Sequence, residues 1–326
     1  DSCLVGSEMC IRDSNKGVFC TLTFDYQLIN KTLLMISKDQ VTEIFTFVDE
    51  FYTEFEQITS QFIIGNKPKR KPRLNPSEVI TIMILFQLSG IRCFKWFYRD
   101  YLSKRFSAEF PQLVSYNRFV ELQKQVVLPM ALLAKTCCTG ECTGVSFGDS
   151  TPIRVCNNKR IFNHKVFKGI ASRGKSTMGY FYGFKLHLII NDLGQILNFQ
   201  ITQANVDDRT PLKQGNILKK IWGKLYGDKG YVSKKLTQTL FNDGIHLVTG
   251  IRKNMKNQLM PLFDKIMLRK RSIIETINDQ LKNICMIEHS RHRSFHNFIN
   301  NLIAGLIAYH FLPKKPKVKY HEFYPC

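Results

Sequence analysis

Hydrophobic and polar positions along the chain predict a helical part, a strand-rich part and a second helical part. The first part, residues 35–143, contains two clear helix patterns. Ser37 is a suitable N-cap for one helix, while Asn75 and Glu78 start the other, which stops at Gly90. We therefore expect a helical N-terminal region.

The middle part alternates between apolar strands and short helices. The run 144–150 is apolar and ends in a carboxylate, Asp149, and residues 181–202 form a hairpin pattern around a turn at 191–194. The pattern then predicts a helix, a strand, a helix and a strand, in that order at 209–220, 221–225, 233–241 and 245–250. Three strands followed by alternating helices and strands indicate an α/β fold, with a mixed sheet and flanking helices.

The last helical part carries an informative stripe within residues 268–284. Ile274, Ile277, Leu281 and Ile284 repeat at helical spacing and predict one buried face. On a different side of the same helix lie three charged residues, Arg271, Glu275 and Lys282. Taken by itself, this polar stripe is better explained as an ordinary surface ion pair between Arg271 and Glu275.

The charge of the chain favours a polyanionic partner. Lys and Arg number 47 against 26 Asp and Glu, giving a net charge of +21. Nucleic acid rewards such distributed cations, and an anionic membrane is the rival partner. No apolar run is long enough for a transmembrane helix, and the ten cysteines form no evident disulfide framework, which fits a reducing cytoplasm.

The two ends of the chain are predicted to lie outside these three parts. Residues 4–14 resemble the translation of a sequencing-library adaptor, so we expect residues 1–34 to be a non-native leader and Met35 the native start. Residues 313–326 read as a basic tail.

Two clusters of cations are candidates for DNA contact. An extended linker with alternating prolines, residues 66–73, holds five of them: Lys67, Lys69, Arg70, Lys71 and Arg73. The second cluster, a basic turn before the last helix, holds Arg291 and Arg293. A solvated loop is the alternative for the linker.

Three acids from separate elements suggest a metal site. Asp228, in the stretch YGDKGY, follows a predicted strand as Asp149 does, and Glu275 lies on a predicted helix. Mg²⁺ prefers hard oxygen ligands of this kind and completes its shell with water and phosphate. A plain turn is the alternative for Asp228. Glu288 is the rival third acid, whereas Asp192, Asp207 and Asp208 read as turn or cap residues.

Several of these segments together resemble a known family. FGDSTPIRVCNNKRIFNHKVFKG, RGKSTMGYFYGFKLHLIINDLGQ, NVDDRTPL, YGDKGY and RKRSIIETINDQLKNICMIEHSRHRSF resemble the DDE transposases of bacterial insertion sequences, in particular the insertion sequence 982 family. The resemblance runs from about Met35 to the C-terminus. It implies a ribonuclease H-like catalytic domain at 144–312 behind a helical DNA-binding region at 35–143.

The resemblance also implies a chemistry. Asp149, Asp228 and Glu275 would bind Mg²⁺, with Mn²⁺ as a substitute, and would use two metal ions to cleave DNA phosphodiesters and join the freed 3′-hydroxyl ends to target DNA. Arg271 and Lys282 match basic positions of a related signature that contact DNA, although Leu268 stands where that signature has a tyrosine. Lys229 would meet substrate phosphate.

The implied partners are double-stranded DNA, both element ends and target, and a second copy of the chain in a synaptic homodimer, in the bacterial cytoplasm at the nucleoid. The alternative function is a catalytically inactive DNA-binding relic or repressor derived from a transposase.

Overall fold

The computed structural model describes residues 36–62, 72–176, 178–251, 255, 259–288 and 292–319. These residues belong to one compact unit, residues 34–326. The predicted leader and five predicted DNA contacts, Lys67, Lys69, Arg70, Lys71 and Arg291, lie outside the described residues. Within the described part of the chain, no helix combines the length and apolarity that crossing a bilayer requires.

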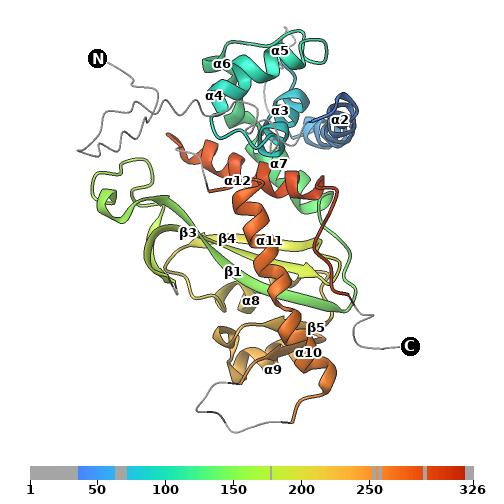
Figure 1. Cartoon of the computed structure of the whole chain (residues 1–326), viewed down its shortest axis with the longest axis vertical. Helices are drawn as coiled ribbons and strands as arrows, with labels where there is room; N and C mark the ends of the chain where they lie inside the picture. The colour runs from blue at the N-terminus through green and yellow to red at the C-terminus, as the bar shows by residue number, and fades with distance from the viewer. Residues whose placement is uncertain are drawn as a thin grey trace, which may run out of the picture. The chain divides into compact units, whose positions relative to one another are not determined.

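Helices come first and last in the order of elements, and strands lie between them (Figure 1). The helices and short turns before the sheet are α2 (Lys38–Ser60), α3 (Pro76–Leu88), α4 (Phe94–Trp96), η1 (Phe97–Leu102), α5 (Ser103–Arg105), α6 (Tyr116–Leu122), η2 (Gln123–Val126) and α7 (Val127–Thr136). The sheet and its connections are β1 (Val145–Cys156), η3 (Asn158–Arg160), β2 (Ser172–Ser176), β3 (Gly179–Asn191), β4 (Ile196–Gln203), α8 (Thr210–Lys213), η4 (Asn216–Leu218), β5 (Gly223–Gly227), η5 (Lys229–Tyr231), α9 (Lys234–Asn242) and β6 (Ile245–Thr249). The last helices are α10 (Leu262–Lys270), α11 (Ser272–Asn283) and α12 (Phe295–His310).

The predicted helix starts before the sheet are confirmed. The Ser37 hydroxyl accepts the Gln40 backbone N–H at 3.1 Å, and the Glu78 carboxylate accepts the Asn75 N–H at 2.6 Å. Helix α3 is apolar on all sides and is buried along its whole length, between α2 on one side and α12 on another. The C-terminal helix therefore shares a core with the N-terminal helices. The predicted domain boundary at residues 143 and 144 stays a prediction.

The predicted mixed sheet is confirmed, with the strand order β2-β3-β1-β5-β6 and β4 beside β3. Strand β1 pairs antiparallel with β3 and parallel with β5, and β5 pairs parallel with β6. The predicted hairpin corresponds to β3 and β4, and β2 is a further strand that the hydrophobic pattern did not reveal. Its sequence, SRGKS, is polar and contains no apolar alternation.

Three boundary predictions need correction. Asp149 does not end its strand, because β1 continues to Cys156 through its antiparallel pairing with β3. The helix expected at 209–220 is only α8, since Gly215 takes a left-handed φ of +72° and a turn of 3₁₀ helix follows. The helix through residue 284 ends at Asn283, and Met286 has a φ of +44°, so Glu288 does not continue it.

Helices cover the two faces of the sheet. Helix α11 contacts β1, and α10 contacts β5 and β6 (Figure 1). The Asp264 carboxylate of α10 accepts hydrogen bonds from Lys224 and Tyr226 of β5, both at 2.7 Å. An apolar core on the other face includes Ile217, Leu225 and Leu240, which come from η4, β5 and α9.

Gly223 is a steric constraint at the start of the parallel pair β1–β5. Its φ is +83°, and a Cβ there would lie 2.5 Å from the carbonyl oxygen of Gly144. We expect Gly223→Ala to lower the free energy of unfolding by about 1–2 kcal/mol for backbone strain and by about a further 1–3 kcal/mol for overpacking. Gly215→Ala is the matched control, because Gly215 has a φ of +72° and open space around its Cα. Urea unfolding checks the pair, and equal losses would contradict the steric argument.

Candidate active site

Asp149 and Asp228 lie on neighbouring strands at the same level. The parallel register pairs Phe147 of β1 with Tyr226 of β5. Asp149 comes two residues after Phe147, and Asp228 comes two residues after Tyr226. The Asp228 carboxylate accepts the backbone N–H of Lys229 at 2.7 Å and caps the short helix η5. The sheet thus holds one carboxylate within β1 and one directly after β5.

Helix α11 brings the third acid to the same place. Arg271 Nη2 lies 2.9 Å from Glu275 Oε1, and Arg271 Nη1 lies 3.9 Å from Asp149 Oδ1. One turn further along the helix, Asn278 Nδ2 donates a hydrogen bond of 3.2 Å to Asp149 Oδ2. Arg271 therefore stands between two of the three predicted carboxylates and balances their charge.

The surroundings of Asp149, including the other two predicted acids, shift its pKa. Burial raises the pKa of Asp149 to about 6, and the negative charges of Glu275 and Asp228 raise it further, whereas Arg271 and the Ser150 backbone N–H oppose the rise. Both other predicted acids thus act on Asp149. The site carries more negative charge than Arg271 alone compensates.

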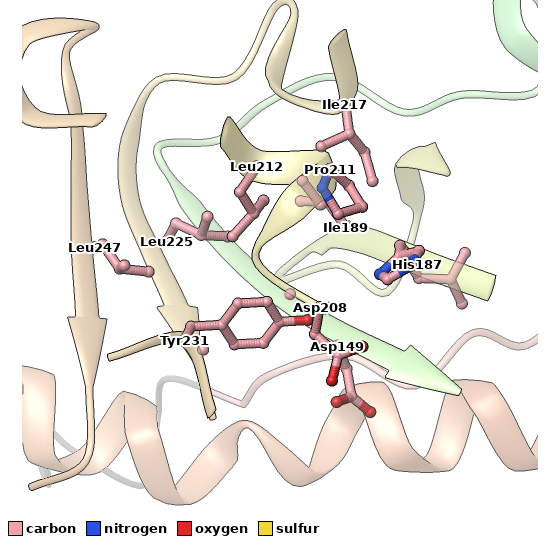
Figure 2. A pocket seen from close by; sticks show the side chains of 13 residues that line it. Asp149, His187, Ile189, Asp208, Pro211, Leu212, Ile217, Leu225, Tyr231 and Leu247 are labelled. Atoms are coloured by element: carbon pink, nitrogen blue, oxygen red, sulfur yellow. The ribbon is translucent and has the colours of Figure 1, made fainter. Parts of the chain in front are cut away.

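Behind Asp149 lies a small cavity of about 10 Å³, enough for about one water molecule. Figure 2 shows Tyr231 with its hydroxyl directed toward Asp208 and Asp149, while Leu212 and Leu225 lie along the apolar side. Burial raises the pKa of Tyr231 far above its ordinary value, and the charges of Asp149 and Asp208 add to this. Tyr231 is therefore a phenol and not a phenolate near neutral pH, so its O–H remains available as a donor at the back of the site.

Asp208 and Tyr231 are two polar residues of this cavity that the sequence did not single out for the site; His187 is a third. Asp207, not Asp208, pairs with Arg209, at 2.6 Å. Asp208 instead accepts a bond from Lys185 Nζ at 2.9 Å and reaches the cavity from the loop before α8. The motifs NVDDRTPL and YGDKGY contain both residues, but no periodicity marks their meeting.

A groove of about 530 Å³ adjoins this cavity at Asp208. Its lining includes two acids, Asp207 and Asp208, and three cations, Arg173, Lys175 and Lys185, of which Lys185 is paired with Asp208. Arg173 lies 4.9 Å from the ring centre of the exposed Tyr180. Such a surface suits a phosphate backbone.

The other predicted DNA contacts fall in different surroundings. Lys229 is exposed beside Asp228, and Arg73 and Arg293 are exposed next to α3 and α12. Lys282 donates to the Pro152 carbonyl at 2.9 Å and lies 3.4 Å from Glu288.

Glu288, the rival third acid, also accepts the Arg154 backbone N–H at 2.9 Å, so its carboxylate ties the segment after α11 to the far part of β1. No contact or charge effect connects it with Asp149, whereas Glu275 acts on Asp149 directly.

Asp149, Asp228 and Glu275 are carboxylates, which supply the oxygen donors that Mg²⁺ prefers. As they stand, the described side chains include no group of three or more His, Cys, Asp or Glu arranged to hold a metal ion. In the structure Glu275 is paired with Arg271, and the Glu275 side chain is 59% exposed.

Burial of Asp149 gives a testable pH dependence. A raised folded-state pKa means that the folded protein binds this proton more tightly than the unfolded chain does, so stability falls as pH rises from 3.8 to about 6. The loss amounts to at most about 3 kcal/mol. We expect urea unfolding without divalent ions to show this fall in the wild type relative to Asp149→Asn. An identical pH profile in the two proteins would contradict the environment described for Asp149.

Comparison with known proteins places this site within a described domain. The chain has 12% sequence identity to a piggyBac transposase synaptic complex with hairpin DNA, at a TM-score of 0.44, covering 82% of this chain and 72% of that one. Two Mos1 transposase structures give lower TM-scores. The strand transfer complex has a TM-score of 0.23 and 12% identity, covering 83% of this chain and 95% of that one. The paired-end complex with the left transposon end has a TM-score of 0.20 and 11% identity, covering 68% of this chain and 70% of that one. Scores below 0.5 do not establish a common fold, and no curated protein matches the chain.

The family comparison is more direct. Residues 139–295 match the family model described as the transposase DDE domain. This segment, just under half of the chain, contains Asp149, Asp228 and Glu275, and the match supports a DDE transposase.

Proposed function

We propose that the chain is a transposase that binds the ends of an insertion sequence of the 982 family, cleaves DNA there and joins the 3′-hydroxyl ends to target DNA. The observation that carries the proposal is the meeting of three acids from β1, β5 and α11. The negative charges of Asp228 and Glu275 raise the pKa of Asp149, and all three acids lie in the segment that matches the transposase DDE domain. The sheet, with strands β1–β4 joined by antiparallel pairings and β5 and β6 parallel to β1, supports a ribonuclease H-like catalytic domain at 144–312.

In this proposal Asp149, Asp228 and Glu275 hold two Mg²⁺ ions, or Mn²⁺ in their place. When bound, divalent ions supply Lewis-acid activation of the nucleophile and stabilise the leaving oxygen at phosphorus. The chain's own groups prepare the carboxylates. Asn278 orients Asp149, and the Lys229 N–H orients Asp228, through bonds of 3.2 Å and 2.7 Å.

Arg271 has two tasks in the proposed reaction. Without substrate it balances the charge of Asp149 and Glu275. When Glu275 turns away from it, the guanidinium becomes available to hold a DNA phosphate beside the carboxylates, which its planar donor geometry suits. Lys229 and the basic groove with Arg173 and Lys175 would guide the strand toward Asp149. The substrate is double-stranded DNA, and two copies of the chain pair two ends.

The central experiment is cleavage of labelled duplex DNA that carries the flanking inverted repeats, with Mg²⁺ present. We expect nicking at the repeat boundary, reduced more than about a hundredfold in Asp228→Asn and Glu275→Gln, because each variant removes several kcal/mol of transition-state stabilisation. Glu288→Gln is the matched control and should cleave normally. DNA binding should persist in both inactive variants.

The outcomes separate the alternatives. Binding without cleavage by the wild type would support an inactive DNA-binding relic or repressor. Loss of cleavage in Glu288→Gln but not in Glu275→Gln would overturn the choice of the third acid. If element-end and random DNA compete equally at raised salt, the chain is a nuclease without end specificity.

Metal binding has a readout that does not require activity. We expect Mg²⁺ to raise the free energy of unfolding of the wild type near neutral pH, by about 2.7 kcal/mol at a concentration of about 100 Kd. Asp149→Asn should show little of this gain. An equal gain in both proteins would indicate that the ion binds elsewhere, and no gain in the wild type would contradict the proposed site.

A further inference from the structure

A second cavity lies away from the acids, where the N-terminal helices meet α12. It has a volume of about 680 Å³ and is lined by side chains of α3, α4, α6 and α12 and by the residues just before α12. We call it the helical-region cavity. It includes none of the three predicted acids, and the DDE mechanism assigns it no role.

The floor of the helical-region cavity is polar although it is buried. Gln87 and Asn301 are 1% and 5% exposed. Gln87 Nε2 donates to Asn301 Oδ1 at 2.6 Å and to the Asn301 carbonyl at 3.2 Å, which joins α3 to α12. Within the described part of the chain, Gln87 Oε1, Asn301 Nδ2 and Asn297 Oδ1 have no hydrogen-bond partner.

Such atoms are costly to bury, so their concentration at one cavity points to a ligand with matching polar groups. Gln87 and Asn301 offer an acceptor and a donor beside each other. The edge of a nucleobase carries a donor and an acceptor side by side in the same way. Both atoms are buried in the structure, but the terminal torsions of the amides are soft, so the amides can rotate toward a ligand at the cost of the Gln87–Asn301 bond.

The walls of the helical-region cavity suit the face of a base, and its rim suits a phosphate. Phe86, Phe94 and Tyr116 line the walls. Phe94 and Tyr116 pack on each other and on further rings but are only partly buried, and their remaining exposed surface can contact a base. The rim carries two exposed cations, Lys95 and Arg293, which suit a phosphate.

One acid, Glu121, also lines the helical-region cavity. It forms an ion pair of 2.8 Å with Arg118, so its charge is balanced.

We propose that the helical-region cavity binds one unpaired nucleotide of the DNA substrate. The base stacks on the aromatic wall and pairs with Gln87 and Asn301, and its phosphate lies at Lys95 and Arg293. A base within a duplex is stacked and paired on both edges, so only an extruded or unpaired nucleotide can enter. This inference rests on the proposed function in taking DNA as the substrate, but it does not depend on cleavage.

The test compares two fluorescein-labelled duplexes of one sequence, one perfectly paired and one with a single unpaired adenine. Fluorescence anisotropy with the full chain should show about tenfold tighter binding of the bulged duplex. Replacing both amides together, Gln87→Leu with Asn301→Leu, changes no charge and leaves no new unpaired partner. This double variant should bind both duplexes equally, with its affinity for the perfect duplex unchanged.

A second double variant, at two exposed positions, tests whether the double amide variant loses the preference merely because it folds poorly. Lys95→Ala with Arg293→Ala should lose most of the preference for the bulge, whereas Lys104→Ala, an exposed lysine of α5 outside the cavity, should keep it. Equal wild-type affinity for the two duplexes, or an unchanged preference in either double variant, would overturn the proposal. Asp228→Asn should retain the preference, so a failure of catalysis and a failure of this site are told apart.

Discussion

The parallel pairing of β1 with β5 is the constraint on which the candidate site depends. It covers only Val145–Phe147 and Lys224–Tyr226, yet it sets the level of Asp149 within β1 and of Asp228 directly after β5. Buried rings stabilise it, with Phe147 and Tyr226 at a centroid distance of 5.6 Å. Close backbone contact between Gly144 and Gly223 lets the two strands begin together. Any slip in this register would separate the two carboxylates.

The third acid is positioned through a longer chain of contacts. Burial alone would raise the pKa of Asp264, but hydrogen bonds from Lys224 and Tyr226 outweigh it and hold the pKa below its usual value. A buried, ionised carboxylate paired in this way resists displacement, because separating it from its partners would leave an uncompensated charge. It anchors α10 to β5. Helix α11 follows α10 directly, with Arg271 at the junction, and so carries Glu275 over β1. Strand β5 thus positions both acids: Asp228 directly follows it, and Glu275 is positioned through the contact of α10 with β5.

The sequence contains the local part of this arrangement but not its long-range part. The helix cap at Ser37, the helix near 233–241, the β3–β4 hairpin and the buried stripe through Ile274 follow from propensity and period, and the structure confirms them. The extent of β1 beyond Asp149 depends on its pairing with β3, which no local pattern encodes. The same holds for Asp208 and Tyr231, whose side chains meet at the cavity only because the loop before α8 and the turn after β5 lie side by side in three dimensions. Pattern reasoning identifies which acids are unusual, and tertiary contacts decide their neighbours.

Buried polar groups offer a common physical account of both candidate sites. At the acids, the charges of Asp228 and Glu275 add to the effect of burial on Asp149, and Arg271 is the cation beside Asp149 and Glu275. At the helical-region cavity, the unpartnered amide atoms of Gln87 and Asn301 call for a neutral hydrogen-bonding edge. Helix α12 contacts α3, α7 and α11, so the two sites share one packed core. A nucleotide held on the amides would then be fixed relative to the strand that crosses the acids, since packed helices transmit position with little slack. Recognition of an unpaired base and cleavage of a phosphodiester would thereby be coupled by geometry, without a moving part.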